Sequence, residues 1–280
     1  MVIDRMGDLA VVQPNAAWSE AMVGVLVSAL ARVTGVTRVV KNGSGRARGL
    51  EGLPEEIVMA LGTAPDGPVP VPMNGAIYLA DVMGGQKTGL FYDQRPNHAF
   101  AARLGHGGRV LDVFSHVGGF GLAALAAGAR EAVLVDASAA VLALAKGGAE
   151  AMGMRGKVAL RQGDAFAALE QLAAEGETFD LVVCDPPAFA PNKNALEAGL
   201  RAYERVAKLA APLVREGGYL GLCSCSHAAD LAKFRAASAR GIGKAGRRGQ
   251  IVWTGFAGPD HPTLPQLAES SYLKSLFFRL

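Results

Sequence analysis

The sequence predicts a doubly wound α/β fold, in which helices cover both faces of a mainly parallel sheet. From Arg109 onward, short apolar runs alternate with stretches rich in alanine and leucine, as strands and helices do when short loops join them. The apolar runs are continuous, which is typical of strands buried on both faces. The 280 residues, half of them hydrophobic, suffice for one large domain or for a domain with a smaller companion.

The chain begins with a predicted small α/β domain over residues 1–68. Its expected elements are a strand, a helix and a second strand, over 9–13, 16–32 and 36–41. Prolines and a glycine at 65–68 indicate a turn-rich joint. A second domain is therefore predicted over residues 69–280.

The second domain supplies the strands and helices of the predicted sheet. It opens with strand-like runs at 76–79 and 90–92 and a helix that begins near Asp93. Five further strands are expected over 110–114, 132–135, 158–161, 181–184 and 219–223, with helices over 120–127, 139–152, 165–174 and 195–214. The last apolar runs, 251–256 and 272–280, have no clear helix between them. They predict a terminal strand pair, with the last strand antiparallel and seven strands in the sheet.

Composition limits the class of protein. Three cysteines are an odd number and form no disulfide framework. The amino terminus lacks the apolar core of a signal peptide, and polar residues interrupt the apolar stretch 21–33, so that stretch is predicted as a buried helix. We therefore expect a soluble, cytoplasmic protein with no membrane partner, either a monomer or a homodimer.

The net charge of +3 neither requires nor excludes a nucleic-acid partner. Two basic clusters lie in predicted loops, one with Lys41, Arg46 and Arg48 and the other with Arg240, Lys244, Arg247 and Arg248. Either cluster could contact phosphates or form a solvated loop. The sequence leaves both alternatives open.

The segment 179–189 carries the strongest functional signal. Its apolar run ends in Asp185, Pro186 and Pro187, and the aromatic Phe189 follows. Prolines lack the donor that a strand needs, so Asp185 is left at the carboxyl edge of the sheet, where open α/β folds bind their ligands. An acid and an aromatic residue held there could address a flat hydrogen-bonding group such as a nucleobase.

The loops after the first three strands of the parallel sheet indicate the ligand. Asp112 lies in the first strand, and a glycine-rich turn through Gly118 follows it. The G-x-G-x-x-G spacing of dinucleotide folds is absent, and an early acid with such a turn is the pattern used for S-adenosylmethionine. Asp136 would accept hydrogen bonds from ribose hydroxyls, and Asp164 with Ala165 would lie at an adenine edge. A helix N-cap is the alternative for Asp164.

The fifth strand runs into a cysteine-rich segment with three possible interpretations. Cys223 and Cys225 could be small core residues of one strand face. A metal site of Cys223, Cys225 and His227 does not match ordinary zinc spacing, and no metal is expected. In the third interpretation Cys225 is a nucleophile in a polar, accessible turn near Asp185, and Cys184 and Cys223 are packed and inert.

A cysteine at this position suits one reaction of nucleobases. C5 of a pyrimidine becomes nucleophilic once a thiolate has added to C6, and C5 can then take a methyl group from a sulfonium. Asp185 would hydrogen-bond the N3/N4 edge of a cytosine and support protonation at N3. The target base must leave its stack to reach both groups.

Four segments of the chain resemble one known family. They are Lys-Thr-Gly-Leu-Phe-Tyr-Asp-Gln-Arg at 87–95, Phe-Ser-His-Val-Gly-Gly-Phe at 114–120, Asp-Pro-Pro-Ala-Phe at 185–189 and Ser-Cys-Ser at 224–226. In this order they are similar to the bacterial large-subunit ribosomal RNA cytosine-C5 methyltransferase family. The similarity covers essentially the whole chain, including 51–54 and 261–262, and the first segment is the most specific.

The resemblance implies a class I S-adenosylmethionine-dependent methyltransferase, Rossmann-like, preceded by a small α/β domain that contacts RNA. Ribosomal RNA would be the partner and S-adenosylhomocysteine the product. The nucleophile would be Cys225, because the family uses the cysteine after the fifth strand and has none after the Pro-Pro pair, where Ala188 stands here. The candidate donor-binding residues are Gln94, Arg95, Asp112, Phe114, Ser115, His116, Gly118, Asp136, Ala137, Asp164, Ala165 and Asp185. The candidate substrate-binding residues are Arg95, Pro186, Pro187 and Phe189.

The chain departs from the family pattern in two places. Members usually begin with an RNA-binding PUA domain, whereas this chain begins where that domain would end. His116 replaces a common tyrosine of the glycine-rich turn, which could alter the donor contacts. Methylation of an exocyclic amine is the nearest alternative, followed by an RNA-binding protein with a vestigial donor pocket. A nicotinamide oxidoreductase is disfavoured by the missing glycine spacing.

Overall fold

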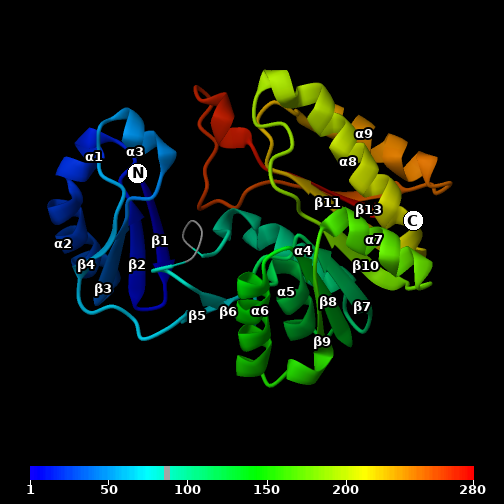
Figure 1. The fold of residues 1–280 in the computed structure, drawn as a ribbon, viewed down its shortest axis with the longest axis horizontal. Helices are drawn as coiled ribbons and strands as arrows, with labels where there is room; N and C mark the ends of the chain where they lie inside the picture. The colour runs from blue at the N-terminus through cyan, green and yellow to red at the C-terminus, as the bar shows by residue number, and fades with distance from the viewer. Residues whose placement is uncertain (85–88) are drawn as a thin grey trace. The chain divides into compact units, whose positions relative to one another are not determined.

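The computed structural model describes residues 1–84 and 89–280 (Figure 1). The chain divides into a small unit, Met1–Pro72 with Leu79–Leu90, and a large unit, Met73–Tyr78 with Phe91–Leu280. Among the described residues, no helix has both the length and the hydropathy needed to cross a bilayer. Lys87 and Thr88 of the 87–95 motif lie outside the described residues.

A seven-stranded sheet organises the large unit. In spatial order its strands are β12 (Gln250–Gly255), β13 (Lys274–Arg279), β11 (Val214–Ser224), β10 (Phe179–Cys184), β7 (Arg109–Val113), β8 (Glu131–Asp136) and β9 (Val158–Gln162). The strands from β11 to β9 in this order are parallel, whereas β13 runs antiparallel to both β11 and β12. The predicted α/β fold with an antiparallel last strand is confirmed.

Helices pack on both faces of this sheet. They are α4 (Arg95–Leu104), α5 (Gly119–Ala126), α6 (Ala139–Ala151), α7 (Ala165–Ala174), α8 (Leu196–Ala210) and α9 (Leu231–Lys244) (Figure 1). Alternate strand residues such as Leu111 and Val113 share a buried cluster with residues of α7, α8 and α9. Leu134 faces the other way, so close to α5 that a Cβ at Gly121 would come within 2.3 Å of its Cδ2.

The predicted strand at 90–92 is wrong. Tyr92–Gln94 forms a single 3-10 turn, η1, that leads directly into α4. The Asp93 side chain stabilises this turn because its Oδ1 accepts the N–H of Gln94 at 3.0 Å. Pro96 then occupies the first turn of α4, where no backbone donor is needed.

Two further predictions about helices need correction. The helix predicted over 195–214 ends at Ala210, because Pro212 in the following 3-10 turn, η4 (Ala211–Leu213), cannot continue it. Arg240 and Lys244 lie in α9 rather than in a loop. Asp230 starts that helix, since its carboxylate accepts the N–H of Lys233 at 2.8 Å. Between β12 and β13, the only helical turn described is η5 (Ala268–Ser271).

The small unit contains a four-stranded sheet in the order β1 (Val2–Met6), β2 (Leu9–Gln13), β3 (Arg38–Asn42) and β4 (Ile57–Leu61). Its described helices are α1 (Ala17–Ala21), α2 (Val23–Thr34) and α3 (Arg46–Leu50). The strands predicted at 9–13 and 36–41 are present as β2 and β3. The predicted helix over 16–32 is broken at Met22 into α1 and α2, and β1 and β4 were not predicted. Two short strands, β5 (Val69–Met73) and β6 (Ala76–Ala80), lie where the chain passes between the units.

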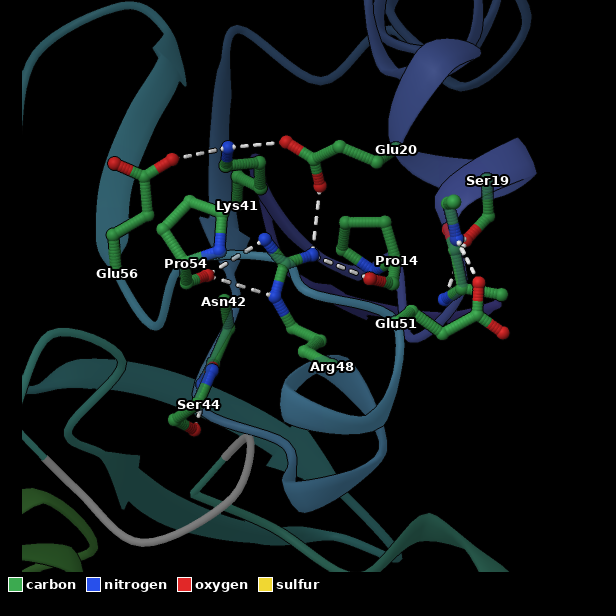
Figure 2. A network of polar contacts seen from close by, with 12 residues as sticks. Pro14, Ser19, Glu20, Lys41, Asn42, Ser44, Arg48, Glu51, Pro54 and Glu56 are labelled. Carbon is green, nitrogen blue, oxygen red and sulfur yellow. Dashed lines mark hydrogen bonds and ion pairs between the residues drawn. The ribbon is translucent and has the colours of Figure 1, made fainter.

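An ion-pair network centred on Arg48 holds the small unit together (Figure 2). Arg48 is fully buried, and its Nη1 donates to Glu20 Oε2 at 2.7 Å and to the Pro14 carbonyl at 2.5 Å. Lys41 Nζ donates to Glu20 Oε1 at 2.7 Å and to Glu56 Oε1 at 2.5 Å. Hydrogen bonds from Lys41 and Arg48 lower the pKa of Glu20, so this stabilisation is lost as the pH falls through that lowered pKa.

For the first basic cluster, the expectation of a solvated loop is wrong at Lys41 and Arg48, which lie in β3 and α3, buried and paired within the unit. In the second cluster, Arg240 and Lys244 pair with Glu204. Arg247 donates to the Ala211 and Val214 carbonyls at 3.2 and 2.8 Å. Several basic residues of the two clusters therefore pair with groups of their own unit.

Replacing Arg48 with methionine is expected to destabilise the small unit by about 3 kcal/mol, because the partly buried Glu20 carboxylate and the Pro14 and Pro54 carbonyls lose the donor that a fully buried guanidinium gives them. Urea unfolding followed by hydrogen exchange in β3 measures this loss. Arg38→Met is the matched control, since the Arg38–Asp8 pair is exposed (side chains 26% and 56%) and contributes less than about 1 kcal/mol. Equal losses in the two variants would contradict the structural role of Arg48.

Candidate active site

The loops that carry the predicted site residues leave the same edge of the seven-stranded sheet. In the parallel ladder, Cys184 of β10 pairs with Val113 of β7 and with Leu222 of β11. Asp185 follows β10 directly, and Cys225 follows β11. Both residues therefore lie at the carboxyl edge of the sheet, as the sequence predicts.

Asp112 anchors the turn between β7 and α5. Its side chain is fully buried, and Oδ2 accepts the N–H groups of Phe120 at 3.1 Å and Gly121 at 2.8 Å. Burial raises the pKa of the Asp112 carboxyl well above its ordinary value, and the Gly121 amide opposes that rise. Asp112 thus binds the first N–H groups of α5 and fixes the turn in front of it.

The turn has a left-handed backbone at alternate positions, with φ of 62° at Phe114, 50° at His116 and 83° at Gly118. A Cβ at Gly118 would lie 2.9 Å from Leu122 Cγ, and one at Gly119 would lie 2.8 Å from His98 Nε2. These neighbours are protein side chains. The glycines are therefore required by the close packing of α5, a reason different from the ligand contact inferred from sequence.

Some buried polar atoms near this turn make no hydrogen bond. Among the described atoms, Asp112 Oδ1 and Ser115 Oγ are buried without a hydrogen bond. Asp136 lies beside them, since its Oδ2 accepts the His116 N–H at 2.9 Å and its Oδ1 accepts the Ser138 N–H at 2.9 Å. Because buried polar atoms in folded proteins are nearly always paired, this arrangement favours a polar ligand at the turn.

The loop after β9 supports a structural role for its acid. Asp164 caps α7, with Oδ1 accepting the Ala167 N–H at 3.0 Å. Ala165 is buried, and the Ala137 carbonyl accepts a hydrogen bond from Gln162 Nε2 at 3.3 Å. Asp164 is therefore the N-cap residue of α7, as one of the two interpretations expected.

Gln94 connects the 87–95 motif to the acid after β10. It is buried, and its Nε2 donates to Asp185 Oδ2 at 3.0 Å. Asn97 Nδ2 donates to Gln94 Oε1 at 2.7 Å, which fixes the orientation of the Gln94 amide. The two amides form a relay of hydrogen bonds that orients the Asp185 carboxylate.

Arg95 and Asp93 tie the same motif to the segment after β12. Arg95 Nη2 lies 3.0 Å from Asp260 Oδ2, with 41% of the arginine side chain exposed. Asp93 Oδ2 accepts the hydroxyl of Tyr272 at 2.6 Å. Arg95 therefore remains accessible at the surface, whereas Asp93 holds the chain just before β13.

The residues that follow Asp185 differ in their exposure to solvent. Pro186 is buried, Pro187 is exposed and Phe189 is half-buried. The Phe189 ring packs on three aromatic rings, those of Phe114 (6.3 Å between centroids), Phe166 (6.2 Å) and Tyr203 (5.0 Å). These contacts anchor the loop between the turn after β7 and α8.

The three cysteines lie in different surroundings. Cys184 and Cys223 are buried, and burial raises the pKa of both thiols. Cys223 Sγ accepts a hydrogen bond from Ser275 Oγ at 3.2 Å. Cys225 is only partly buried. This difference bears out the expectation that Cys184 and Cys223 are packed and that Cys225 is accessible.

Serines on both sides of Cys225 are fixed by one tyrosine. Ser224 Oγ donates to Tyr203 Oη at 2.9 Å, and Ser226 Oγ lies 2.7 Å from the same oxygen. Ser226 Oγ also accepts the N–H of Ala190 at 2.9 Å, which joins this loop to the loop after Asp185. The backbone that carries Cys225 is thus held in a buried polar frame.

Sequence reasoning missed several residues of this site. Asn97, Tyr203, Tyr272 and Lys274 contact its loops, although none belongs to a recognisable short motif. In the part of the chain that the structure describes, no group of three histidine, cysteine, aspartate or glutamate side chains is placed to hold a metal ion.

The sequence is similar to that of curated proteins over its whole length. It is 34% identical over 281 residues to ribosomal RNA large subunit methyltransferase I of Erwinia tasmaniensis and, to the same extent, to that of Aeromonas hydrophila. The match covers 100% of this chain and 71% of each relative. A family model described as conserved hypothetical protein 95 matches residues 95–210.

Solved structures share the fold. A proposed SAM-dependent methyltransferase from Streptococcus mutans superposes with a TM-score of 0.83 at 20% identity, covering 99% of this chain and 70% of that one. The SAM-dependent methyltransferase from Agrobacterium tumefaciens gives a TM-score of 0.67 at 18% identity, with 99% and 86% covered. At these identities the likeness establishes the Rossmann-like methyltransferase fold.

Proposed function

The chain belongs to the ribosomal RNA large subunit methyltransferase I family, and we propose that it transfers a methyl group to C5 of a cytosine in large-subunit ribosomal RNA. Cys225 is the covalent nucleophile in this proposal. The observation that carries it is the partly exposed Cys225 thiol at the sheet edge that also presents Asp185. The 34% identity to relatives named as ribosomal RNA methyltransferases supports the substrate class.

S-adenosylmethionine is the donor, and when bound it supplies a methyl group carried on a positively charged sulfur. We assign its site to the turn between β7 and α5, where Asp112 Oδ1 and Ser115 Oγ are buried without partners. Asp136 and the half-exposed Arg95 border that turn in the assignment. The remaining candidate donor residues are Gln94, Phe114, His116, Gly118, Ala137, Asp164, Ala165 and Asp185.

The chemistry proceeds through an adduct between the thiol and the base. The Cys225 thiolate forms a bond to C6, and the π electrons of the C5=C6 bond move into the ring while N3 is protonated. Asp185, oriented by Gln94, accepts hydrogen bonds from the protonated N3 and the N4 amino group. The adduct leaves C5 nucleophilic, and the bound donor would supply the methyl group that C5 takes, its sulfur keeping the bonding pair. Loss of the C5 proton to a base and of the N3 proton restores the C5=C6 double bond and the neutral ring, and expels the Cys225 thiolate.

Substrate binding is assigned to both units of the chain. The exposed Pro187 and Arg95 would contact the extruded base, with Pro186 and Phe189 holding the loop behind them. The small unit is proposed to contact RNA, through surfaces other than the internally paired Lys41 and Arg48.

Product identification tests the proposal. The purified chain is incubated with S-adenosylmethionine labelled in its methyl group and ribosomal RNA from a strain lacking the enzyme. The RNA is digested to nucleosides, and mass spectrometry should find the label in 5-methylcytidine. Label in an N-methylated nucleoside would instead favour exocyclic-amine chemistry. Absence of donor binding in calorimetry would favour an RNA-binding protein.

A further inference from the structure

A buried lysine lies beside the nucleophile loop. Lys274 opens β13, and the antiparallel ladder pairs it with Ser224, the residue before Cys225. Only 4% of Lys274 is exposed. Its Nζ donates to the carbonyl oxygens of Ser226 at 2.6 Å and Ala229 at 2.7 Å, so it binds the backbone that follows Cys225.

Burying an ammonium group is costly, and a buried lysine usually has a partner or a function. Burial lowers the pKa of Lys274 to about 8, and the charges of Cys225 and Asp230 oppose that fall. The Asp230 carboxylate is already bound to Lys233 and caps α9. Cys225 also interacts electrostatically with Lys274, and a thiolate there would compensate the buried positive charge.

We propose that Lys274 is a positioning residue for Cys225, holding its loop through two carbonyl oxygens and supplying the positive charge against which its thiolate forms. This inference rests on the proposed role of Cys225 as nucleophile. It extends that role, because a thiol is reactive only as the thiolate and a neighbouring cation increases the thiolate fraction.

Of the other titratable groups described around the loop, Lys233 is a cation, and it is paired with Asp230. Tyr203 and Tyr272 interact electrostatically with Cys225, and both are neutral acids with pKa values raised by burial. The His227 ring packs on Tyr272 at 5.7 Å between centroids. Asp230 lies near Lys274 as well, and Asp185 lies at the same sheet edge as Cys225.

The pH dependence of Cys225 alkylation tests the proposal. The whole chain is treated with iodoacetamide across a range of pH, and the modified peptide is quantified by mass spectrometry, with the buried Cys184 and Cys223 as internal controls. Lys274→Met should raise the midpoint of the pH dependence of Cys225 alkylation by about one pH unit, and it should slow alkylation at pH 7 about tenfold. Lys274→Arg, which keeps the positive charge, should restore most of the rate. Lys208→Met removes an exposed lysine of α8 and should change nothing.

An unchanged midpoint in folded Lys274→Met would overturn the proposal. If that variant fails to fold, the proposal can be tested on the unaltered chain alone. An alkylation midpoint for Cys225 at or above about pH 8.5, the ordinary pKa of a thiol, would exclude a stabilising cation. The alkylation assay needs neither RNA nor donor. If the alkylation of Cys225 depends on Lys274 but methylation does not need Cys225, only the proposed function is refuted.

Discussion

Replacing Cys225 with alanine is expected to reduce methyl transfer by at least about 10³-fold, because an unactivated C5 of cytosine cannot take the methyl group. The change removes only the reacting atom. Ser224 and Ser226 hold the loop through Tyr203, and Lys274 holds it through backbone carbonyls, so none of these contacts involves the thiol. The folded state and donor affinity should remain near those of the unchanged chain. Turnover is measured by the transfer of a labelled methyl group to RNA. Thermal unfolding measures the stability of the fold, and calorimetry measures the donor affinity.

Cys223→Ala is the matched control for this result. It makes the same chemical change two residues earlier, at a buried thiol that accepts a hydrogen bond from Ser275. We expect a stability loss of about 1 kcal/mol and nearly full turnover. Full activity in Cys225→Ala, or loss of activity in both variants, would refute a specific covalent role for Cys225.

The sequence predicted the parallel sheet well because its strands are continuous apolar runs that need no distant partner to be recognised. The helix at 165–174 has its predicted bounds, since Asp164 is a local N-cap signal. The helix α9 was not predicted, because the glycines and arginines within it resemble a loop until its buried face packs against α8. Similarly, β1 and β4 depend on pairing with neighbours rather than on a strong local pattern.

The candidate site was only partly predictable for the same reason. Asp185 and Cys225 follow recognisable strand ends, so their shared edge follows from the order of parallel strands. Gln94 meets Asp185 through a side-chain contact across 91 positions of sequence, and Lys274 meets the Cys225 loop only because β13 pairs with β11. The expectation that Arg48 lies in a loop was wrong, because the sequence alone does not show whether an arginine is paired inside the fold.

The substitution Asp185→Asn is expected to lower kcat by about 10²–10⁴-fold. The carboxylate accepts hydrogen bonds at two oxygens, whereas the amide has only one acceptor oxygen. Gln94 Nε2 donates to Asp185 Oδ2 and is itself fixed by Asn97, so the asparagine must turn its carbonyl oxygen toward Gln94. Its amino group then faces the base, where N4 and the protonated N3 need an acceptor. Single-turnover rates with saturating RNA measure the effect on the chemical step.

Asp180→Asn makes the same substitution at the opposite end of the same strand. Asp180 accepts the Arg109 N–H at 2.7 Å and pairs with Arg215, away from the edge that carries Asp185. Its replacement should lower stability and leave the single-turnover rate within about twofold of the unchanged chain. If the two asparagine variants lose the same rate, the effect at position 185 is structural. A loss confined to Asp185→Asn assigns the carboxylate to the chemistry, since the sheet, the charge removed and the side-chain shape are common to both variants.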